Sequence, residues 1–387
     1  MNNPIKIWRE LKNIYLKYID SGLPLNDEHL VKERRKLYEE PGAICQPPII
    51  ELVPRYKEVA TLKEACNELK IDTDFVDFAK CGLFPDFKGV ERKLYQHQKD
   101  ALKHAFVERK HIVATTGTGS GKTECFLLPA IADLVVESKK WDSNRKRAVR
   151  TLILYPLNAL AEDQMIRLRR SLNSTNSDRT GARDWLDDNR DKHRFYFGRY
   201  TGKTPVSGNR ERRKDEYRKQ KEKHIEDWNA ARNAATLSDR EESKELLYHV
   251  PSMDDDSAEM WDRWSMQDNP PDILITNYSM LNIMLLRNYE NSIFEKTKEW
   301  LAEDREKNVF HLVVDEMHTY RGTAGTEVAY LLRLLLKRLG LTPDSPQVQF
   351  LTSSASMQEN EKTEKYITSF FGVDNNTQVS HPFKKRI

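Results

Sequence analysis

The 387-residue sequence lacks the long apolar segments that would place it in a membrane. No stretch stays apolar over the roughly 20 residues that a membrane-spanning helix requires. The strongest apolar run, at 330–336, is interrupted by Arg333, and the first eight residues contain no apolar signal core. The sequence therefore predicts a protein that works without a membrane, and the cytoplasm is the expected location.

Cysteine is also scarce. Four cysteines are scattered along the chain with no C-x-x-C pair, so neither a zinc site nor a disulfide framework is indicated. The net charge of +3 is too small to indicate a polyanion partner, although local basic stripes remain compatible with one. No internal repeat is evident, and the length allows about two to three domains.

The most informative segment that is present spans residues 111–123, with the sequence HIVATTGTGSGKT. An apolar strand breaks here into a glycine-rich loop, and an apolar helix follows. Glycines let backbone N–H groups turn toward phosphate oxygens, while the positive end of the helix faces the same anion. In such a loop Lys122 reaches the β- and γ-phosphates and Thr123 offers a hydroxyl to Mg²⁺. The loop predicts a nucleoside triphosphate site made by Thr118, Gly119, Ser120, Gly121, Lys122 and Thr123.

A second acidic element follows the apolar strand predicted at 309–314. It reads Asp315-Glu316-Met317-His318. At the end of a strand beside a phosphate loop, Asp315 is expected to bind Mg²⁺, directly or through water, and Glu316 to polarise the attacking water. The tetrapeptide alone is a weak pattern, but its place after a strand and its pairing with the phosphate loop make it specific.

The remainder of the chain shows how these motifs are organised. Short apolar strands alternate with helices, which predicts an α/β fold with a parallel sheet flanked by helices. Strands are expected at 111–115, 151–155, 195–200, 272–276, 309–314 and 348–352, and helices at 122–138, 158–171 and 324–339. Residues 1–88 are expected to form a mainly helical accessory domain, and residues 89–387 the nucleotide-binding domain.

Residues 205–268 do not follow the alternation of strand and helix. They begin with a dense run of charges and end in an acidic segment around Asp254-Asp255-Asp256. The pattern favours a solvated helical hairpin inserted between two strands. A dedicated contact with nucleic acid or with a partner protein is the alternative.

Taken in order, motifs over residues 90–360 resemble the first RecA-like motor domain of the superfamily 2 DEAD/DEAH-box helicases. The segment LYQHQ at 94–98 resembles the adenine-reading Q motif, which implies that Tyr95 and Gln98 bind the nucleotide. YPLNALAEDQ at 155–164 is similar to motif Ia, RYTGKT at 199–204 to the T-G element, and TNYSML at 276–281 to the next backbone-contact motif. Ser354-Ala355-Ser356 resembles the S-A-T motif, which couples hydrolysis to strand movement.

This resemblance implies a role for individual residues. Catalysis would fall to Lys122, Asp315, Glu316 and His318. The phosphates of a nucleic-acid strand would be held by Pro156, Asn158, Thr201, Gly202, Thr276 and Asn277, and coupling would fall to Ser354 and Ser356. Arg167, Arg169 and Arg170 either add attraction for the strand or form an ordinary solvated helix face. Met317 and Ser356 depart from the common alanine and threonine, but both carboxylates remain, so an active ATPase is expected.

Within the superfamily, the wording of these motifs resembles the Lhr- and MrfA-like DNA helicases and the large helicases of the antiphage systems Druantia and DISARM. The resemblance implies an ATP- and Mg²⁺-dependent DNA helicase or translocase in antiphage defence or DNA repair. Motifs IV to VI, with their arginine finger, have no counterpart here. A second RecA-like domain, in a full-length protein or a partner subunit, is therefore expected. An RNA helicase, or a nucleotide-gated clamp with little turnover, are the alternatives.

Overall fold

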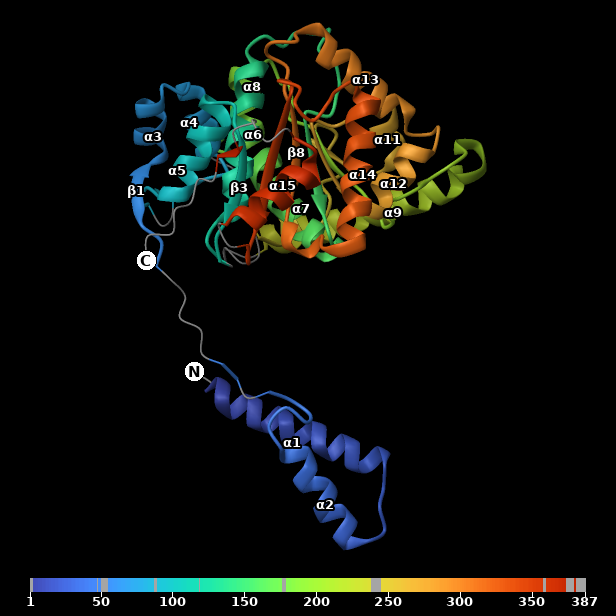
Figure 1. Cartoon of the computed structure of the whole chain (residues 1–387). Coiled ribbons are helices and arrows are strands. Elements are labelled where there is room, and N and C mark those ends of the chain that lie inside the picture. The colour runs from blue at the N-terminus through green and yellow to red at the C-terminus, as the bar shows by residue number, and fades with distance from the viewer. Residues whose placement is uncertain are drawn as a thin grey trace. The chain divides into compact units, whose positions relative to one another are not determined.

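A computed structural model describes residues 3–46, 48–49, 55–86, 89–117, 119–175, 179–237, 245–357, 360–373 and 379–380. The chain divides into two compact units, Met1–Arg55 and Tyr56–Ile387 (Figure 1). Among the described helices, none is both long and apolar enough to cross a membrane.

The N-terminal unit contains two capped helices, α1 (Pro4–Gly22) and α2 (Glu28–Glu39). Asn3 caps α1 by accepting a hydrogen bond from the Ile5 N–H at 3.0 Å, and proline occupies the first turn, where its missing N–H is not needed. Helix α1 ends at Gly22. An ion pair of 2.8 Å between Arg34 and Asp20 joins α2 to α1.

The larger unit is built on a parallel sheet, which confirms the predicted fold class. The strand order is β10-β3-β9-β8-β4-β7-β5-β6, and each neighbouring pair runs parallel. The strands are β3 (His111–Thr115), β4 (Thr151–Tyr155), β5 (Phe197–Tyr200), β6 (Glu259–Met260), β7 (Ile273–Asn277), β8 (Phe310–Val314), β9 (Val348–Ser354) and β10 (Val379–Ser380). The six strands predicted from the sequence are all present, with ends that differ by at most two residues.

Helices cover both faces of this sheet, because alternate side chains of each buried strand point to opposite sides. Ile153 of β4 faces one hydrophobic cluster and Leu152 and Leu154 face the other. The first face carries α3 (Leu62–Leu69), α4 (Thr73–Lys80), α5 (Gln96–Leu102), α6 (Lys122–Ser138), α7 (Asn158–Asn173) and α8 (Ala182–Asn189). The second carries α11 (Arg263–Asp268), α12 (Tyr278–Leu286), α13 (Asn291–Glu303), α14 (Gly322–Leu339) and α15 (Glu361–Phe371).

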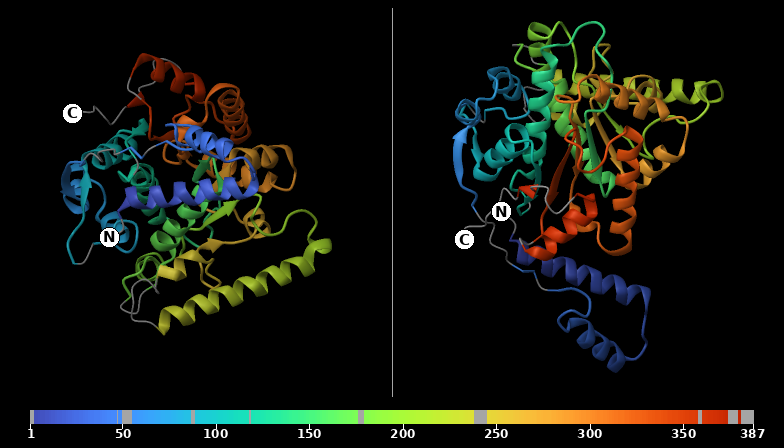
Figure 2. Two further views of the ribbon diagram at one scale, coloured as in Figure 1. Left: turned by 90° about the horizontal axis from the view of Figure 1, so that it is seen from below. Right: turned by 45° about the horizontal axis from the view of Figure 1, so that its top comes forward.

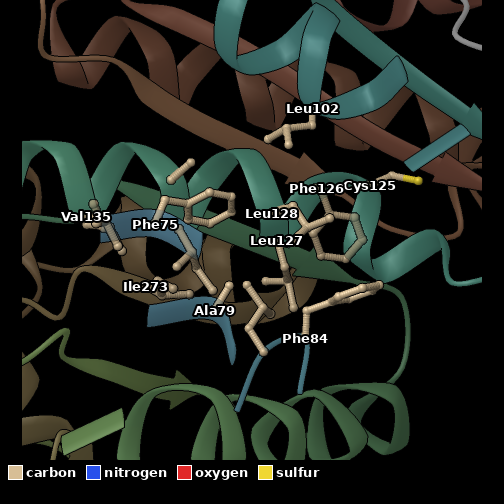
Figure 3. Close-up of a cluster of buried hydrophobic side chains, with 14 of the residues drawn as sticks. Phe75, Ala79, Phe84, Leu102, Cys125, Phe126, Leu127, Leu128, Val135 and Ile273 are labelled. Carbon is tan, nitrogen blue, oxygen red and sulfur yellow. The ribbon is translucent and has the colours of Figure 1, made fainter. Parts of the chain in front are cut away.

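The boundary between the units differs from the predicted one, which lay near residue 88. Phe75 and Ala79 of α4 share a buried cluster with Phe126 and Leu127 of α6 (Figure 3). Strand β1 (Glu58–Thr61) also pairs antiparallel with β2 (Lys93–Tyr95), across the predicted boundary. Residues 56–86 therefore belong to the core of the larger unit, because their apolar faces are buried against α6.

In the insertion at 205–268, predicted as a helical hairpin, the described residues contain one long helix, and residues 238–244 lie outside the described part of the chain. A single helix of 27 residues, α9 (Arg210–Thr236), has no buried residue and is the long yellow-green helix in Figure 2. A short 3₁₀ turn, η2 (Leu246–His249), follows. The end of the segment returns to the fold, where β6 forms the edge of the sheet and α11 packs into the core.

Candidate functional site

The predicted motifs meet at one edge of the sheet. Because the strands run parallel, their carboxyl ends lie together. The glycine-rich loop follows β3, Ser353 and Ser354 end β9, and Asp315 follows β8. Farther along the same edge, Pro156 follows β4, Asn277 ends β7 and Thr201 follows β5.

The glycine-rich loop has the backbone shape that its sequence requires. Gly119 and Gly121 both take left-handed conformations, with φ of 73° and 74°, which L side chains rarely adopt. The Thr116 and Ser120 hydroxyls lie 2.5 Å apart and are buried, so Thr116 closes the loop where the usual pattern has glycine. The Ser120 side chain therefore faces the interior. Thr118 lies outside the described residues.

Three rings flank this loop. The Gly117 N–H donates to the Tyr56 hydroxyl at 3.0 Å. The Tyr95 and His97 rings are stacked with centroids 5.5 Å apart, and the Tyr56 ring meets the edge of His97 at 5.1 Å. His97 donates from Nε2 to the Ser120 carbonyl at 2.8 Å, and burial lowers the pKa of its imidazole. The rings are thus tied to the loop by hydrogen bonds.

Gln98 forms a second side-chain link between the predicted Q motif and the loop. Its Oε1 accepts from the Tyr95 N–H at 3.0 Å, and its Nε2 donates to the Gly121 carbonyl at 3.2 Å. The side chain is almost fully buried. A methyl group at Gly121 would approach Gln98 Nε2 to 2.3 Å, so glycine is needed here for space as well as for φ. The structure therefore shows Gln98 supporting the loop, beyond the base contact that the resemblance implied.

The two carboxylates predicted after β8 are held in different ways. Glu316 Oε1 lies 3.5 Å from Lys122 Nζ, across 194 residues of sequence. Glu316 itself has a positive φ of 49°, which turns its side chain out of the strand direction. Asp315 Oδ1 accepts hydrogen bonds from the Ser353 hydroxyl and, at 2.9 Å, from the Glu316 N–H. Burial raises the pKa of the Asp315 carboxyl, and the neighbouring Glu316 carboxylate raises it further.

His318 connects this pair to β9. Its Nδ1 lies 3.2 Å from Glu316 Oε2 and 3.4 Å from the Ser354 hydroxyl. Of the two residues predicted for coupling, Ser354 is therefore in contact with the acidic element, while Ser356 lies on the exposed turn beyond the strand. Met317 is fully buried in the second core cluster, so its larger side chain is accommodated.

The residues predicted to bind the phosphates of a nucleic-acid strand are only partly accessible to solvent. Asn158 and Asn277 lie side by side, with Asn277 Nδ2 donating to Asn158 Oδ1 at 2.8 Å. Gly202 is exposed. The side chains of Thr201 and Thr276 are fully buried, and the Thr276 hydroxyl donates to the Tyr200 carbonyl at 2.7 Å. Both threonines are therefore shielded from a ligand in this structure. Pro156 is half-buried at the start of the loop after β4.

Two further observations complete the site. Arg169 is almost completely buried and forms a bidentate ion pair with Glu259 at 2.8 Å, so it is not part of a solvated face or a strand contact. Ser353 was missed by the sequence reasoning, which singled out only its neighbours in the S-A-S motif. The run Thr352-Ser353-Ser354, polar within a wholly buried strand, is the signal that could have found it.

The sequence of this chain is similar to those of several known proteins. Residues 95–201 match the family model described as DEAD/DEAH box helicase. The chain is 33% identical over 394 residues to the Druantia protein DruE of Escherichia coli strain UMEA 4076-1, covering 92% of this chain and 21% of that protein. It is 26% identical over 262 residues to an uncharacterized ATP-dependent helicase of Methanocaldococcus jannaschii, covering 68% of this chain and 26% of that protein.

Among solved structures, the DUF1998 helicase MrfA bound to DNA and AMPPNP aligns at 20% identity with a TM-score of 0.46. That alignment covers 91% of this chain and 34% of MrfA. The chain spans between a fifth and about a quarter of the length of the two curated relatives. The matched residues run from the Tyr95 motif through the glycine-rich loop to Thr201. The chain carries a DEAD/DEAH box helicase domain.

Proposed function

We propose that this chain binds ATP with Mg²⁺ and hydrolyses it to drive movement along nucleic acid, with DNA as the track. The contact between Lys122 and Glu316 is the observation that carries this proposal. It places the Lys122 ammonium, which is expected to bind phosphate, beside the Glu316 carboxylate, the candidate general base. Both lie at the N-terminus of α6. When triphosphate enters, Lys122 exchanges the Glu316 carboxylate for phosphate oxygens, which frees Glu316 to orient and polarise water.

Mg²⁺ would be held by the Thr123 hydroxyl and the Asp315 carboxylate together with the phosphates. Among the described residues, no group of three or more His, Cys, Asp or Glu side chains could hold a metal ion by itself. This fits Mg²⁺, which in phosphate-transfer sites commonly keeps several waters and takes one or two carboxylates. The ion would neutralise charge that develops on the phosphate oxygens.

The same edge of the sheet supports strand binding. Asn158, Asn277 and the exposed backbone at Gly202 offer amide and N–H groups, which bind phosphates without reading bases. His318 contacts both Glu316 and Ser354, so it connects the candidate general base to the end of β9. Through this connection, hydrolysis would be coupled to movement of the nucleic acid. A second RecA-like domain, in the full-length protein or a partner, would supply the arginine finger, which is worth about 10³–10⁵ in rate in related hydrolases.

Antiphage defence, or alternatively DNA repair, is the proposed setting. The identity of 33% with the Druantia protein DruE across 92% of this chain supports the first.

ATP hydrolysis by the complete protein, or by this chain with any copurifying partner, tests the proposal. Single-stranded DNA, duplex DNA and RNA are compared, with Glu316→Gln as the inactive control. Stimulation by DNA that is absent in the variant supports a DNA motor. Stimulation by RNA alone would instead indicate an RNA helicase. ATP binding without turnover under every condition would leave only a nucleotide-gated clamp.

A further inference from the structure

A groove separates α9 from the loop at 202–207 that follows β5. It encloses about 410 Å³, which lies within the range of about 300–1,000 Å³ that is typical of ligand sites. Arg213 and Lys223 line it from α9, and Lys203 lines it from the loop. Glu216 and Asp227 are the acidic residues in the lining. The groove is therefore polar and carries more basic than acidic side chains.

Helix α9 is fixed beside the groove by aromatic contacts. The Tyr217 ring stacks on Trp261 and Trp264, with centroids 5.3 and 5.2 Å away. At the start of the helix, Arg210 forms an ion pair with Asp268 of α11 at 2.6 Å. Since α11 belongs to the core, these contacts anchor the charged helix to the rigid part of the unit.

The opposite wall of the groove is also ordered. The Thr204 hydroxyl donates to the Arg199 carbonyl at 2.6 Å and accepts from the Thr201 N–H at 2.9 Å. Val206 has a φ of 48°, a conformation that β-branched residues seldom adopt. The loop is thus held in one shape by its own hydrogen bonds.

The lining of the groove includes a buried arginine, Arg263. Arg263 is only 6% exposed and donates from Nη2 to the Thr201 carbonyl at 2.7 Å. Within the described residues its Nε has no hydrogen-bond partner, although the buried Glu290 carboxylate attracts its charge. Burial lowers the pKa of the Arg263 guanidinium, because its charge has lost hydration. An anion in the groove would supply a hydrogen-bond partner for this Nε.

The groove continues the edge of the sheet on which the strand-binding candidates lie. Strand β5 neighbours β7, which neighbours β4, so Thr201–Gly202, Asn277 and Asn158 follow one another along this edge. Lys203 comes directly after Gly202 and is exposed. A polyanion bound at Asn158 and Asn277 would therefore reach the groove without changing direction along the edge.

We propose that this groove takes phosphate groups of the same nucleic-acid strand, so that α9 extends the strand-binding path beyond the edge of the sheet. Arg213, Lys223 and Lys203 would contact the phosphates at the mouth, and Arg263 would balance them from below. The inference rests on the proposed function, since it requires a nucleic-acid strand bound along the carboxyl ends of the β-strands.

Two double variants of α9 test the proposal. Arg213→Gln with Lys223→Gln removes two positive charges that line the groove. Arg218→Gln with Lys221→Gln removes two from the exposed remainder of the same helix. The pairs are matched, because Arg213 and Arg218 each form an exposed ion pair with an acid three residues away, at 3.1 and 3.4 Å. Fluorescence anisotropy of labelled single-stranded DNA is measured with the 387-residue chain over a range of salt concentrations.

The groove variant is expected to bind about tenfold more weakly, with a salt dependence shallower by about 1.4, because each neutralised phosphate of a single strand contributes about 0.7 to the slope. The control variant should match the wild type. If the two variants bind single-stranded DNA equally well and the wild type still binds it, the groove does not bind the strand's phosphates. The proposed function would remain intact. Failure of the wild type to bind any nucleic acid would overturn both.

A labelled poly-glutamate peptide distinguishes the other polyanion. If the wild type binds it, and only the groove variant loses that binding while keeping its affinity for DNA, the groove takes an acidic polypeptide and the proposal is wrong.

Discussion

Ser353 donates its hydroxyl hydrogen to the carboxylate of Asp315, which directly follows the neighbouring strand β8. The Glu316 N–H donates to the same oxygen, Oδ1. The orientation of the candidate metal-binding carboxylate is therefore set by two adjacent strands of the sheet. Such supporting hydrogen bonds determine how well a site is prepared for its ligand.

Replacing Ser353 with alanine should raise the Mg²⁺ concentration needed for half-maximal ATP hydrolysis several-fold. The free energy of unfolding should fall by about 1 kcal/mol, which is typical of one lost hydrogen bond. Thr352→Val is the matched control on the same strand, because the Thr352 hydroxyl has no hydrogen-bond partner among the described residues. An unchanged Mg²⁺ requirement in Ser353→Ala would remove Ser353 from the site.

Replacing Glu316 with glutamine should lower the rate of ATP hydrolysis by about 10²–10⁴-fold, since a general base typically contributes that much. ATP binding should be retained, because the variant also releases Lys122 from its ion pair. Turnover is measured by phosphate release and binding with a fluorescent ATP analogue. Glu306→Gln, at an exposed position before β8, should match the wild type. A variant that hydrolyses ATP normally would show that another group activates the water.

Replacing Gln98 with glutamate should weaken ATP binding about tenfold or more. Glutamate cannot donate to the Gly121 carbonyl unless it is protonated, and an unsatisfied buried acceptor costs about 1–3 kcal/mol. Affinity should recover as the pH is lowered, because protonation restores a donor. Gln96→Glu changes an exposed amide on the same turn and should have little effect. The prediction fails if the two variants bind ATP equally well.

Acid should destabilise the larger unit partly through His111. Its Nδ1 accepts from the Phe350 N–H at 3.1 Å, and burial lowers the pKa of the imidazole to about 4. In the unfolded chain His111 has a pKa near 6.5, so between pH 4 and pH 6.5 the unfolded chain binds more protons than the folded one. The free energy of unfolding is therefore highest above about pH 6.5 and falls as the pH is lowered toward 4. The expected loss between pH 7 and pH 5 is about 2 kcal/mol.

Urea unfolding of the wild type and of His111→Asn at both pH values checks this expectation. Asparagine keeps an acceptor but does not titrate, so the variant should lose less stability in acid. Buried His97 also has a lowered pKa and adds a loss common to both proteins. Identical losses would show that His111 does not contribute.

Replacing Phe75 with alanine should destabilise the whole unit from Tyr56 onward by about 3–5 kcal/mol, because the ring is fully buried in the core shared with α6. ATP binding and the sheet should be lost in one unfolding transition, observed by circular dichroism and nucleotide fluorescence. Leu11→Ala, at a side chain 60% exposed on α1, is the control. An early transition that leaves ATP binding intact would instead support a boundary near residue 88.

The nucleotide end of the fold could be predicted because its signals are local. A buried strand, a loop with glycines at positive φ and a helix N-terminus are written in consecutive residues, from His111 to Thr123. The carboxylates after β8 follow the same rule. The order of the strands, which brings Lys122 to Glu316, is not contained in these local signals.

Features that depend on distant partners could not be predicted in this way. In the sequence, Arg169 has the position of a surface residue on an amphipathic helix. In the structure it is buried and paired with Glu259, which lies 90 residues away. Strand β6 is only two residues long, too short to show any periodicity, yet it ends the sheet. The apolar pattern of α4 shows that one face is buried, but the pattern does not identify α6 as its partner.

The order of the strands places the glycine-rich loop and the carboxylates toward one end of the sheet, around β3, β9 and β8, and α9 at the other, after β5. Two strands, β4 and β7, lie between them. Helix α9 is consequently separated along the sheet from the proposed nucleotide site. A change in α9 would then alter the proposed nucleic-acid contact without altering the proposed nucleotide site.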